Sequence, residues 1–207
     1  MLKLNNYMID EKVTDYSEQL KKLCIEHYFT EHPHLKEVVD VLDYCKLTLA
    51  DGGSTLVFKT DKGYIAVIRR DDCKINMGKL RKELGIDSIR MATDEEFKAL
   101  TGLKPGAARI YIPQITQTYI DEKILEKEFI QAGSGSFTVS INYKTSDLHK
   151  IPNSRIVSIA ELRGEHQKKI KDSYSILTGI TPSGSGEFHI GNYLGAVVPF
   201  LELQKKA

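Results

Sequence analysis

Three glycine-containing loops hold the residues of this sequence that are best suited to chemistry. One loop contains Gly102, Pro105 and Gly106, a second covers residues 132–136, and a third covers residues 181–186. Glycine lets the backbone approach a bound group closely, and free backbone amides stabilise negative charge on an oxygen atom. Each loop therefore predicts a place where amide groups face a carbonyl or a phosphate. The alternative for the first two loops is that they are tight turns between strands without a catalytic role.

The histidines and cysteines do not have the spacing of a metal site. His27, His32 and His34 are close in sequence, but extended backbone around Pro33 would not bring them to one ion. We therefore predict no metal and expect these histidines at the surface or at the edge of a pocket. The three cysteines stand far apart, and we expect free thiols that pack as ordinary side chains. They are Cys24, Cys45 and Cys73.

The elements that must position the loops begin with helices and a hairpin. Apolar residues at helical spacing predict amphipathic helices over residues 16–24 and 35–42, with a short strand at 27–30 between them. Two β-rich runs, 54–59 and 64–69, are joined by a turn at 60–63 and predict a β-hairpin.

Capping residues predict two further helices. Asn76 is a good N-cap for a helix that Gly85 ends, and Thr93 with Glu96 forms a capping box for a helix that continues through Leu100. Ser146 is expected to cap a short closing helix. Short strands are expected at 86–91, 110–112, 118–120, 127–131 and 137–141.

This order of elements predicts a mixed α/β (α+β) domain over residues 1–151, with a curved mixed sheet and surface helices. Ser158 with Glu161 forms another capping box, which predicts a helical linker over 152–173. A strand, a loop and a helix are expected over 174–207.

Composition limits the partners. The net charge is +1, from 29 basic and 28 acidic residues, so the chain lacks the global positive field that drives non-specific nucleic-acid binding. We expect no DNA partner, and any RNA contact must be local. No apolar stretch approaches the roughly 18 residues that span a bilayer, so we expect no membrane partner and a cytoplasmic location.

The segment 175–204 reads SILTGITPSGSGEFHIGNYLGAVVPFLELQ. It resembles the nucleotide-binding entry of a bacterial tryptophanyl-tRNA synthetase, a class I enzyme with a Rossmann-like fold. The resemblance implies a truncated Rossmann-like segment that ends before the rest of that active site, so we expect ATP as a cofactor only if a complete synthetase domain is present. The residues that it assigns to ATP binding are Thr181, Ser183, His189, Gly191 and Asn192.

The first domain carries STLVFKTDKGYIAVI at 54–68, INMGKLRKELGIDSIRMATDEEF at 75–97 and TGLKPGAARIY at 101–111. In this order the motifs resemble the YbaK and prolyl-tRNA-synthetase-associated editing family, whose members hydrolyse mischarged aminoacyl-tRNA. The resemblance covers about residues 16–151 and implies a YbaK-like fold. It also implies a lysine that positions the substrate and a GxxxP loop that shapes the pocket. An aminoacyl ester is already activated, so this chemistry needs no cofactor.

Both family landmarks differ in this chain. Ser54 stands at the lysine position, and the GxxxP loop aligns with residues 106–110, where Ile110 replaces the proline. Lys59 does not replace the lysine, because odd spacing along a strand points it to the face opposite Ser54. We expect Ser54 to keep a hydrogen bond to substrate or water, with Gly106 and Ala107 as oxyanion donors. Ser54 is not expected to be a nucleophile, since the sequence assigns it no adjacent base.

The other expected site residues bind substrate. Gly133, Ser134 and Gly135 are expected to form the facing wall of the pocket together with Gln131. The resemblance places the segment around His32 near the same site.

Three functions remain open. The first is hydrolysis of mischarged aminoacyl-tRNA at its CCA end, associated with a tryptophanyl-tRNA synthetase or acting freely. The second is a non-catalytic module that binds tRNA or a synthetase, because the family lysine and proline are absent. The third is a fragment of a tryptophan–tRNA ligase, which requires catalytic residues beyond Ala207.

Overall fold

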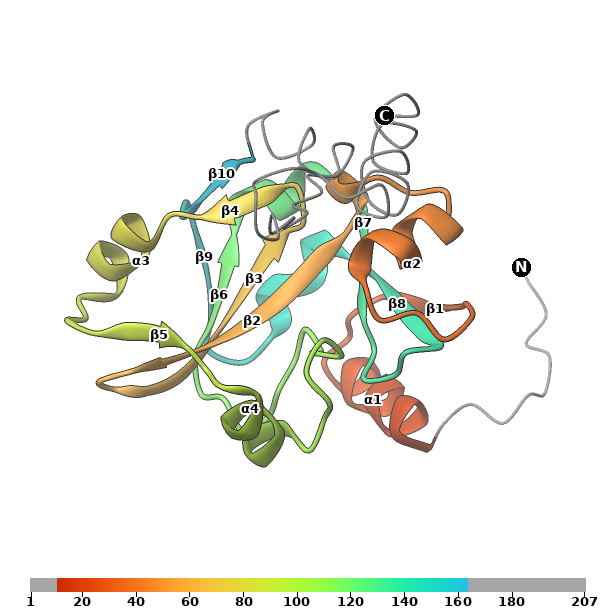
Figure 1. The fold of residues 1–207 in the computed structure, drawn as a ribbon, viewed down its shortest axis with the longest axis horizontal. Coiled ribbons are helices and arrows are strands. Elements are labelled where there is room, and N and C mark those ends of the chain that lie inside the picture. Colours follow the sequence, from red (N-terminus) through yellow and green to blue (C-terminus); the bar gives the residue numbers. More distant parts are fainter. Residues whose placement is uncertain (1–10, 164–207) are drawn as a thin grey trace, which may run out of the picture. The chain divides into compact units, whose positions relative to one another are not determined.

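A computed structural model describes residues 11–163 (Figure 1). The segment 174–207, with the expected ATP-binding residues, lies outside these described residues. The described part contains three sheets and four α-helices, as the expected mixed α/β class requires. Within it, no helix is both long enough and apolar enough to cross a membrane.

The largest sheet has five strands in the order β5-β2-β3-β6-β9. The expected hairpin is confirmed as β2 (Gly53–Thr60) and β3 (Gly63–Arg70), which pair antiparallel with Ser54 opposite Arg69. β5 (Ile89–Met91) extends the β2 edge. β6 (Thr118–Asp121) and β9 (Ser154–Val157) follow β3 in parallel.

Two smaller sheets complete the fold. β1 (His27–Glu31), β8 (Val139–Lys144) and β7 (Phe129–Gly133) form an antiparallel sheet in the order β1-β8-β7, and β4 (Cys73–Ile75) pairs with β10 (Ala160–Leu162). A parallel bridge between Gly52 and Gln131 links β7 to the start of β2. This bridge brings the second glycine loop beside the hairpin.

The helices lie at the ends and edges of the sheets. They are α1 (Glu11–Lys22), α2 (Val38–Tyr44), α3 (Met77–Leu84) and α4 (Asp94–Thr101). Asn76 caps α3 by accepting from the amides of Gly78 and Lys79, and Gly85 ends it in the left-handed conformation. The capping box of Thr93 and Glu96 is present at α4. These local predictions are confirmed.

Three apolar clusters pack the helices against the sheets. The first packs α1 against β7 and β8, with Tyr16, Leu20 and Ile141 fully buried. The second lies between α3 and the large sheet, and the third between the large sheet and α4. The third cluster includes Val57 and Phe97, which also line the cavity described below.

The expected strand at 110–112 is wrong. These residues pair with no strand, although Ile110 and Ile112 are buried. The Tyr16 hydroxyl accepts hydrogen bonds from the amides of Ile110 at 3.0 Å and Tyr111 at 3.4 Å. The Tyr16 hydroxyl of α1 therefore accepts the amide hydrogen bonds that a neighbouring strand would have accepted. Burial raises the pKa of Tyr16.

Replacing Tyr16 with phenylalanine is expected to lower the free energy of unfolding by roughly 1–3 kcal/mol, because the buried amide of Ile110 loses its acceptor. Urea unfolding of the variant measures this. Tyr44→Phe is the matched control, since the Tyr44 side chain is exposed. A Tyr16→Phe protein as stable as this control would contradict the role assigned to the hydroxyl.

The expected helix that opens at Ser158 is also wrong, because the segment forms β9 and β10 instead. The buried Asp121 carboxylate accepts hydrogen bonds from the amides of Ile159 at 2.9 Å and Ala160 at 2.7 Å. Ser158 donates its hydroxyl to Glu122. Tertiary partners thus satisfy the groups that a capping box would have used.

Ser146 does not cap a helix either. The segment is a 3-10 helix, η3 (Thr145–Lys150), whose N-cap is Lys144 and has no side-chain hydrogen bond. Two further 3-10 helices are η1 (Leu49–Asp51), before β2, and η2 (Glu122–Glu126), after β6.

Candidate active site

A cavity of about 240 Å³ lies where the start of β2, the end of β7, α2 and the loop after α4 meet. Its wall is mainly apolar. The apolar side chains include Val38, Leu42, Val57, Ala92, Phe97 and Phe137.

The cavity gathers five of the eight site residues expected in the first domain. Ser54, Gly106, Gln131, Gly133 and His32 line it. They come from segments that are up to about a hundred residues apart in sequence, so the fold has collected them. The other three, Ala107, Ser134 and Gly135, do not line it.

The two glycine loops touch at Gly133. A Cβ atom at this position would lie 2.5 Å from the backbone oxygen of Ala108, far inside contact distance. Only glycine therefore allows β7 to approach the loop so closely. Gly106 has φ +87°, a conformation that favours glycine, and a Cβ there would lie 3.7 Å from the Phe137 ring.

The amide of Ala107 is not available as an oxyanion donor. It donates to the Lys104 carbonyl at 3.1 Å, and Ala107 is buried. Ala108, which we did not expect in the site, does line the cavity. The amides of Gly106 and Ala108 have no hydrogen-bond partner within residues 11–163.

Ser134 and Gly135 contact the Arg109 side chain and do not line the cavity. The Ser134 hydroxyl donates to the Val139 carbonyl at 2.5 Å, and its own carbonyl accepts from the Arg109 Nε at 3.0 Å. The guanidinium of Arg109 also stacks over the Tyr16 ring at 4.5 Å. A Cβ at Gly135 would lie 2.7 Å from the Arg109 Nε, so this turn packs tightly against that side chain.

Ser54 has a partner that sequence analysis missed. Its hydroxyl donates to the Asp71 Oδ1 at 2.5 Å, and the same oxygen lies 3.2 Å from the Arg69 Nη1. Asp71 lines the cavity and is only 5% exposed. The hairpin register, with Ser54 opposite Arg69, was the available signal, because it places the residue after β3 beside the start of β2.

His32 and Gln131 are fixed by their partners. His32 Nδ1 donates to the Pro33 carbonyl at 2.8 Å, since a carbonyl can only accept, and Nε2 lies 3.0 Å from the Ser140 hydroxyl. With both ring nitrogens in use, His32 shapes the cavity rim and is not placed as a base. The Gln131 amide nitrogen donates to the Cys45 sulfur at 3.4 Å.

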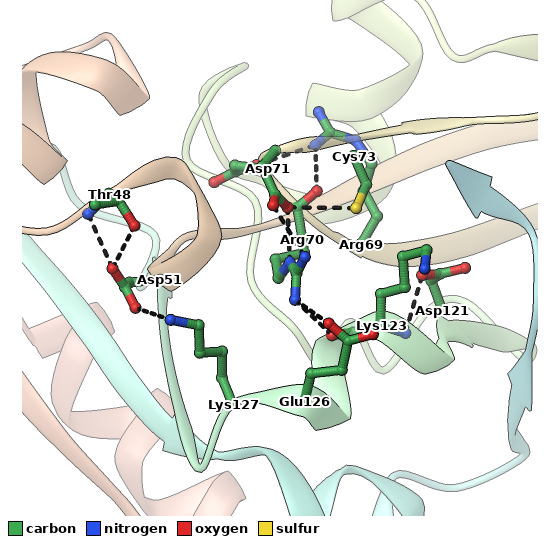
Figure 2. Close-up of polar contacts among 11 residues, drawn as sticks. Thr48, Asp51, Arg69, Arg70, Asp71, Cys73, Asp121, Lys123, Glu126 and Lys127 are labelled. Atoms are coloured by element: carbon green, nitrogen blue, oxygen red, sulfur yellow. Dashed lines mark hydrogen bonds and ion pairs between the residues drawn. The ribbon is translucent and has the colours of Figure 1, made fainter. Parts of the chain in front are cut away.

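A polar network joins the end of β3 to η2, next to Asp71 (Figure 2). Arg70 is buried and bonds to Asp72 at 2.7 Å and to Glu126 at 2.6 Å. Burial raises the pKa of the neighbouring Cys73 thiol to about 11, which disfavours its thiolate form at neutral pH. Lys59 bonds to Glu96 at 3.1 Å and does not line the cavity, as its strand position predicted.

Asp51 anchors the turn that leads into β2. Its carboxylate lies 2.7 Å from the Lys127 Nζ and also accepts hydrogen bonds from the amide and the hydroxyl of Thr48 (Figure 2). These hydrogen bonds, that from Lys127 first, lower the pKa of Asp51 to about 2 from 3.8.

Because the folded pKa of Asp51 lies below the unfolded one, its carboxylate stabilises the fold above about pH 4, and this contribution is lost as the pH falls toward 2. We expect Asp51→Asn to melt at a lower temperature than the wild type at pH 6, with the difference shrinking toward pH 2. Thermal unfolding across this range measures it, with the exposed Asp61→Asn as control. A difference that does not change with pH would contradict the assignment.

Among residues 11–163, no group of three or more histidine, cysteine or acidic side chains is arranged to hold a metal ion. Cys24, Cys45 and Cys73 form no disulfide within residues 11–163. The cavity lining includes the glycine loops, several hydroxyl side chains and one buried carboxylate, which suits binding and polarising a carbonyl group.

Comparisons with known proteins point to one family. The family model described as the aminoacyl-tRNA editing domain matches residues 32–151. A proline–tRNA ligase of Staphylococcus aureus (strain Newman) is 28% identical over 150 residues, covering 65% of this chain and 26% of the ligase. The same enzyme of strain JH1 is 28% identical over 115 residues, covering 54% of this chain and 20% of the ligase. The chain thus spans about a quarter or less of these relatives.

Solved structures show the same fold. A crystal structure of a candidate trans-editing enzyme for prolyl tRNA synthetase superposes with a TM-score of 0.66 at 18% identity, covering 74% of this chain and 99% of that chain. A crystal structure of a hypothetical protein gives 0.66 at 19% identity, covering 73% and 100%. The mixed α/β architecture is therefore that of YbaK-like editing domains.

Proposed function

This chain belongs to the aminoacyl-tRNA editing domain family, and on that premise we propose that it hydrolyses the ester bond of mischarged aminoacyl-tRNA. The observation that carries the proposal is that Gly106 and Ala108, whose amides have no hydrogen-bond partner within residues 11–163, line the same cavity as Ser54 and Gly133. The substrate is the aminoacylated CCA end of tRNA, and no cofactor takes part.

The reaction needs little beyond positioning. Water adds to the ester carbonyl carbon, the carbonyl oxygen becomes an oxyanion, and the bond to the ribose oxygen then breaks with a proton delivered to that oxygen. Amides of Gly106 and Ala108 stabilise the oxyanion, an effect worth roughly 10²–10³ in rate per donor in other enzymes. This assignment replaces Ala107, whose amide is already bonded, with Ala108.

The size and lining of the cavity limit the amino acid. A volume of about 240 Å³ lies below the roughly 300 Å³ at which drug-sized pockets begin. A cavity of this volume favours an aminoacyl group with a small side chain, and its apolar wall favours an uncharged one.

Loss of ester from aminoacyl-tRNA in the presence of the chain tests the proposal. The expected products are a free amino acid and intact, rechargeable tRNA in equal amounts. Ester loss at the rate seen in buffer, with every amino acid tried, would reject it.

A second candidate is a module that binds tRNA or a synthetase without hydrolysis. It is favoured by the Ser54 hydroxyl, whose hydrogen is already given to Asp71, and by the absence of a lysine at this position. This candidate predicts binding of uncharged and charged tRNA with equal affinity and no effect on ester lifetime. Filter binding and ester lifetime together separate the two candidates.

Association with a tryptophanyl-tRNA synthetase is a finer proposal. It rests on the sequence of residues 174–207 alone, where Thr181, Ser183, His189, Gly191 and Asn192 would contribute to an ATP site in a complete synthetase domain. Tryptophan-dependent exchange of pyrophosphate into ATP tests whether such a site is formed.

A further inference from the structure

Three charged side chains line the cavity, one of them buried and two exposed. Among its described lining residues, the carboxylate of Asp71 is buried, whereas Lys36 and Asp94 are exposed. Lys36 is the one cationic lysine or arginine in this lining. A hydrogen-donating part of a ligand is therefore favoured near the buried Asp71.

Ser54 faces a ligand as an acceptor. A hydroxyl group has one hydrogen, and that of Ser54 is donated to the Asp71 Oδ1 at 2.5 Å. The lone pairs of the Ser54 oxygen can therefore accept a hydrogen bond from a ligand in the cavity. A lysine at this position would have offered hydrogen-bond donors and a positive charge, so the present pair inverts the polarity of the position.

The Ser54–Asp71 pair is held in this orientation. Arg69, which does not line the cavity, bonds to Asp71 at 3.2 Å and to the Arg70 carbonyl at 2.9 Å (Figure 2). A Cβ at Gly52 would lie 2.6 Å from the Asp71 Oδ2, so the backbone at Gly52 packs directly against the carboxylate. These contacts hold the carboxylate in place, and Arg69 contacts it from outside the cavity lining.

An aminoacyl ester has two kinds of donor for this acceptor pair, the free ribose hydroxyl and the α-ammonium group, and only the α-ammonium group is charged. The ester carbonyl and the phosphates are acceptors and would be repelled by the Ser54 lone pairs and the Asp71 charge. The α-ammonium group is a charged donor, and hydrogen bonds that involve a charged group are the strong ones. We propose that Ser54 and Asp71 bind the α-ammonium group of the aminoacyl moiety, so that this site requires a free α-amine. The inference rests on the proposed function for the identity of the ligand.

Binding of stable analogues tests the inference without any hydrolysis. In 3′-deoxy-3′-(alanylamino)adenosine an amide replaces the ester, and the propionylamino analogue has the same carbon skeleton without the amine. We expect the full chain to bind the alanyl analogue about tenfold or more tightly than the propionyl analogue, as one charge-assisted hydrogen bond implies. Isothermal titration calorimetry measures both dissociation constants.

Variants at position 54 locate the effect. Ser54→Ala removes the acceptor and should reduce the preference to about threefold or less, and Ser54→Lys should remove it, because its own ammonium would lie beside Asp71. Ser158→Ala, an exposed serine outside the cavity, should retain the full preference. Asp71→Asn removes the charge at nearly constant shape and should also reduce the preference, provided that thermal unfolding shows it folded.

Two outcomes overturn the inference. One is equal binding of the alanyl and propionyl analogues to the wild type, and the other is no binding of either at millimolar concentration. Parallel hydrolysis assays with alanyl-tRNA and N-acetylalanyl-tRNA test amine recognition separately from the proposed deacylase activity. Equal hydrolysis of both esters would leave a deacylase and reject amine recognition, whereas amine-dependent analogue binding without hydrolysis of any ester would support recognition and reject the deacylase.

Discussion

Replacing Gly133 with valine is expected to reduce kcat/KM for ester hydrolysis by about a hundredfold. Any Cβ at this position meets the Ala108 backbone oxygen at 2.5 Å, so β7 and the loop that carries Gly106 and Ala108 must separate. A shift of about 1 Å in a positioned group costs roughly 10²-fold in rate. The measurement is the rate of amino acid release from the most rapidly hydrolysed aminoacyl-tRNA.

The control for this variant is Gly85→Ala. Gly85 ends α3 at φ +57° with nothing within 4 Å of an added Cβ, so alanine strains the backbone without displacing a neighbour. We expect a stability loss of about 1 kcal/mol and an unchanged rate. If Gly133→Val hydrolysed the ester within about threefold of the Gly85→Ala rate, the close approach of the two loops would not matter for catalysis.

Replacing Asp121 with alanine is expected to lower the free energy of unfolding by about 3–5 kcal/mol. Its fully buried carboxylate accepts from three amides, those of Lys123 at 3.1 Å, Ile159 at 2.9 Å and Ala160 at 2.7 Å. Removing it leaves buried donors without an acceptor. Thermal unfolding should show a decrease in Tm of roughly 10 °C or more.

Asp121→Asn and Asp87→Ala complete this experiment. Asparagine keeps one acceptor oxygen and should give an intermediate loss, while Asp87 is exposed and its removal should change Tm by less than about 2 °C. An Asp121→Ala protein with the Tm of the Asp87→Ala control would show that the amides of Lys123, Ile159 and Ala160 find other partners.

Local sequence signals predicted the local structure. The hairpin of β2 and β3, the Asn76 cap and the Thr93 capping box each depend on residues within a short stretch of chain, and each is present. The same logic failed at Ser158, because Asp121 provides acceptors from 38 and 39 residues away in sequence. Its failure at 110–112 has the same cause, since the Tyr16 hydroxyl lies 94 residues from Ile110.

At the candidate site, too, the sequence predicted local features but not the contacts between distant residues. Glycine content pointed to Gly106 and Gly133, which both line the cavity. Sequence alone did not reveal that the Ala107 amide is bonded to Lys104 or that Ser54 has a carboxylate partner. The direction of an amide and the partner of a hydroxyl depend on the packing between sheets, which no local pattern records.

The central claim is that this cavity hydrolyses aminoacyl-tRNA. Its most direct test is the ester half-life of a panel of aminoacyl-tRNAs, each carrying one amino acid, with the full chain and with buffer. The account predicts that one or a few esters, those of small amino acids, decay faster with the wild type and at the buffer rate with Gly133→Val. Decay of every ester at the buffer rate with folded wild-type protein would contradict it, and recovery of hydrolysis in Ser54→Lys would then show that catalysis was lost with the lysine.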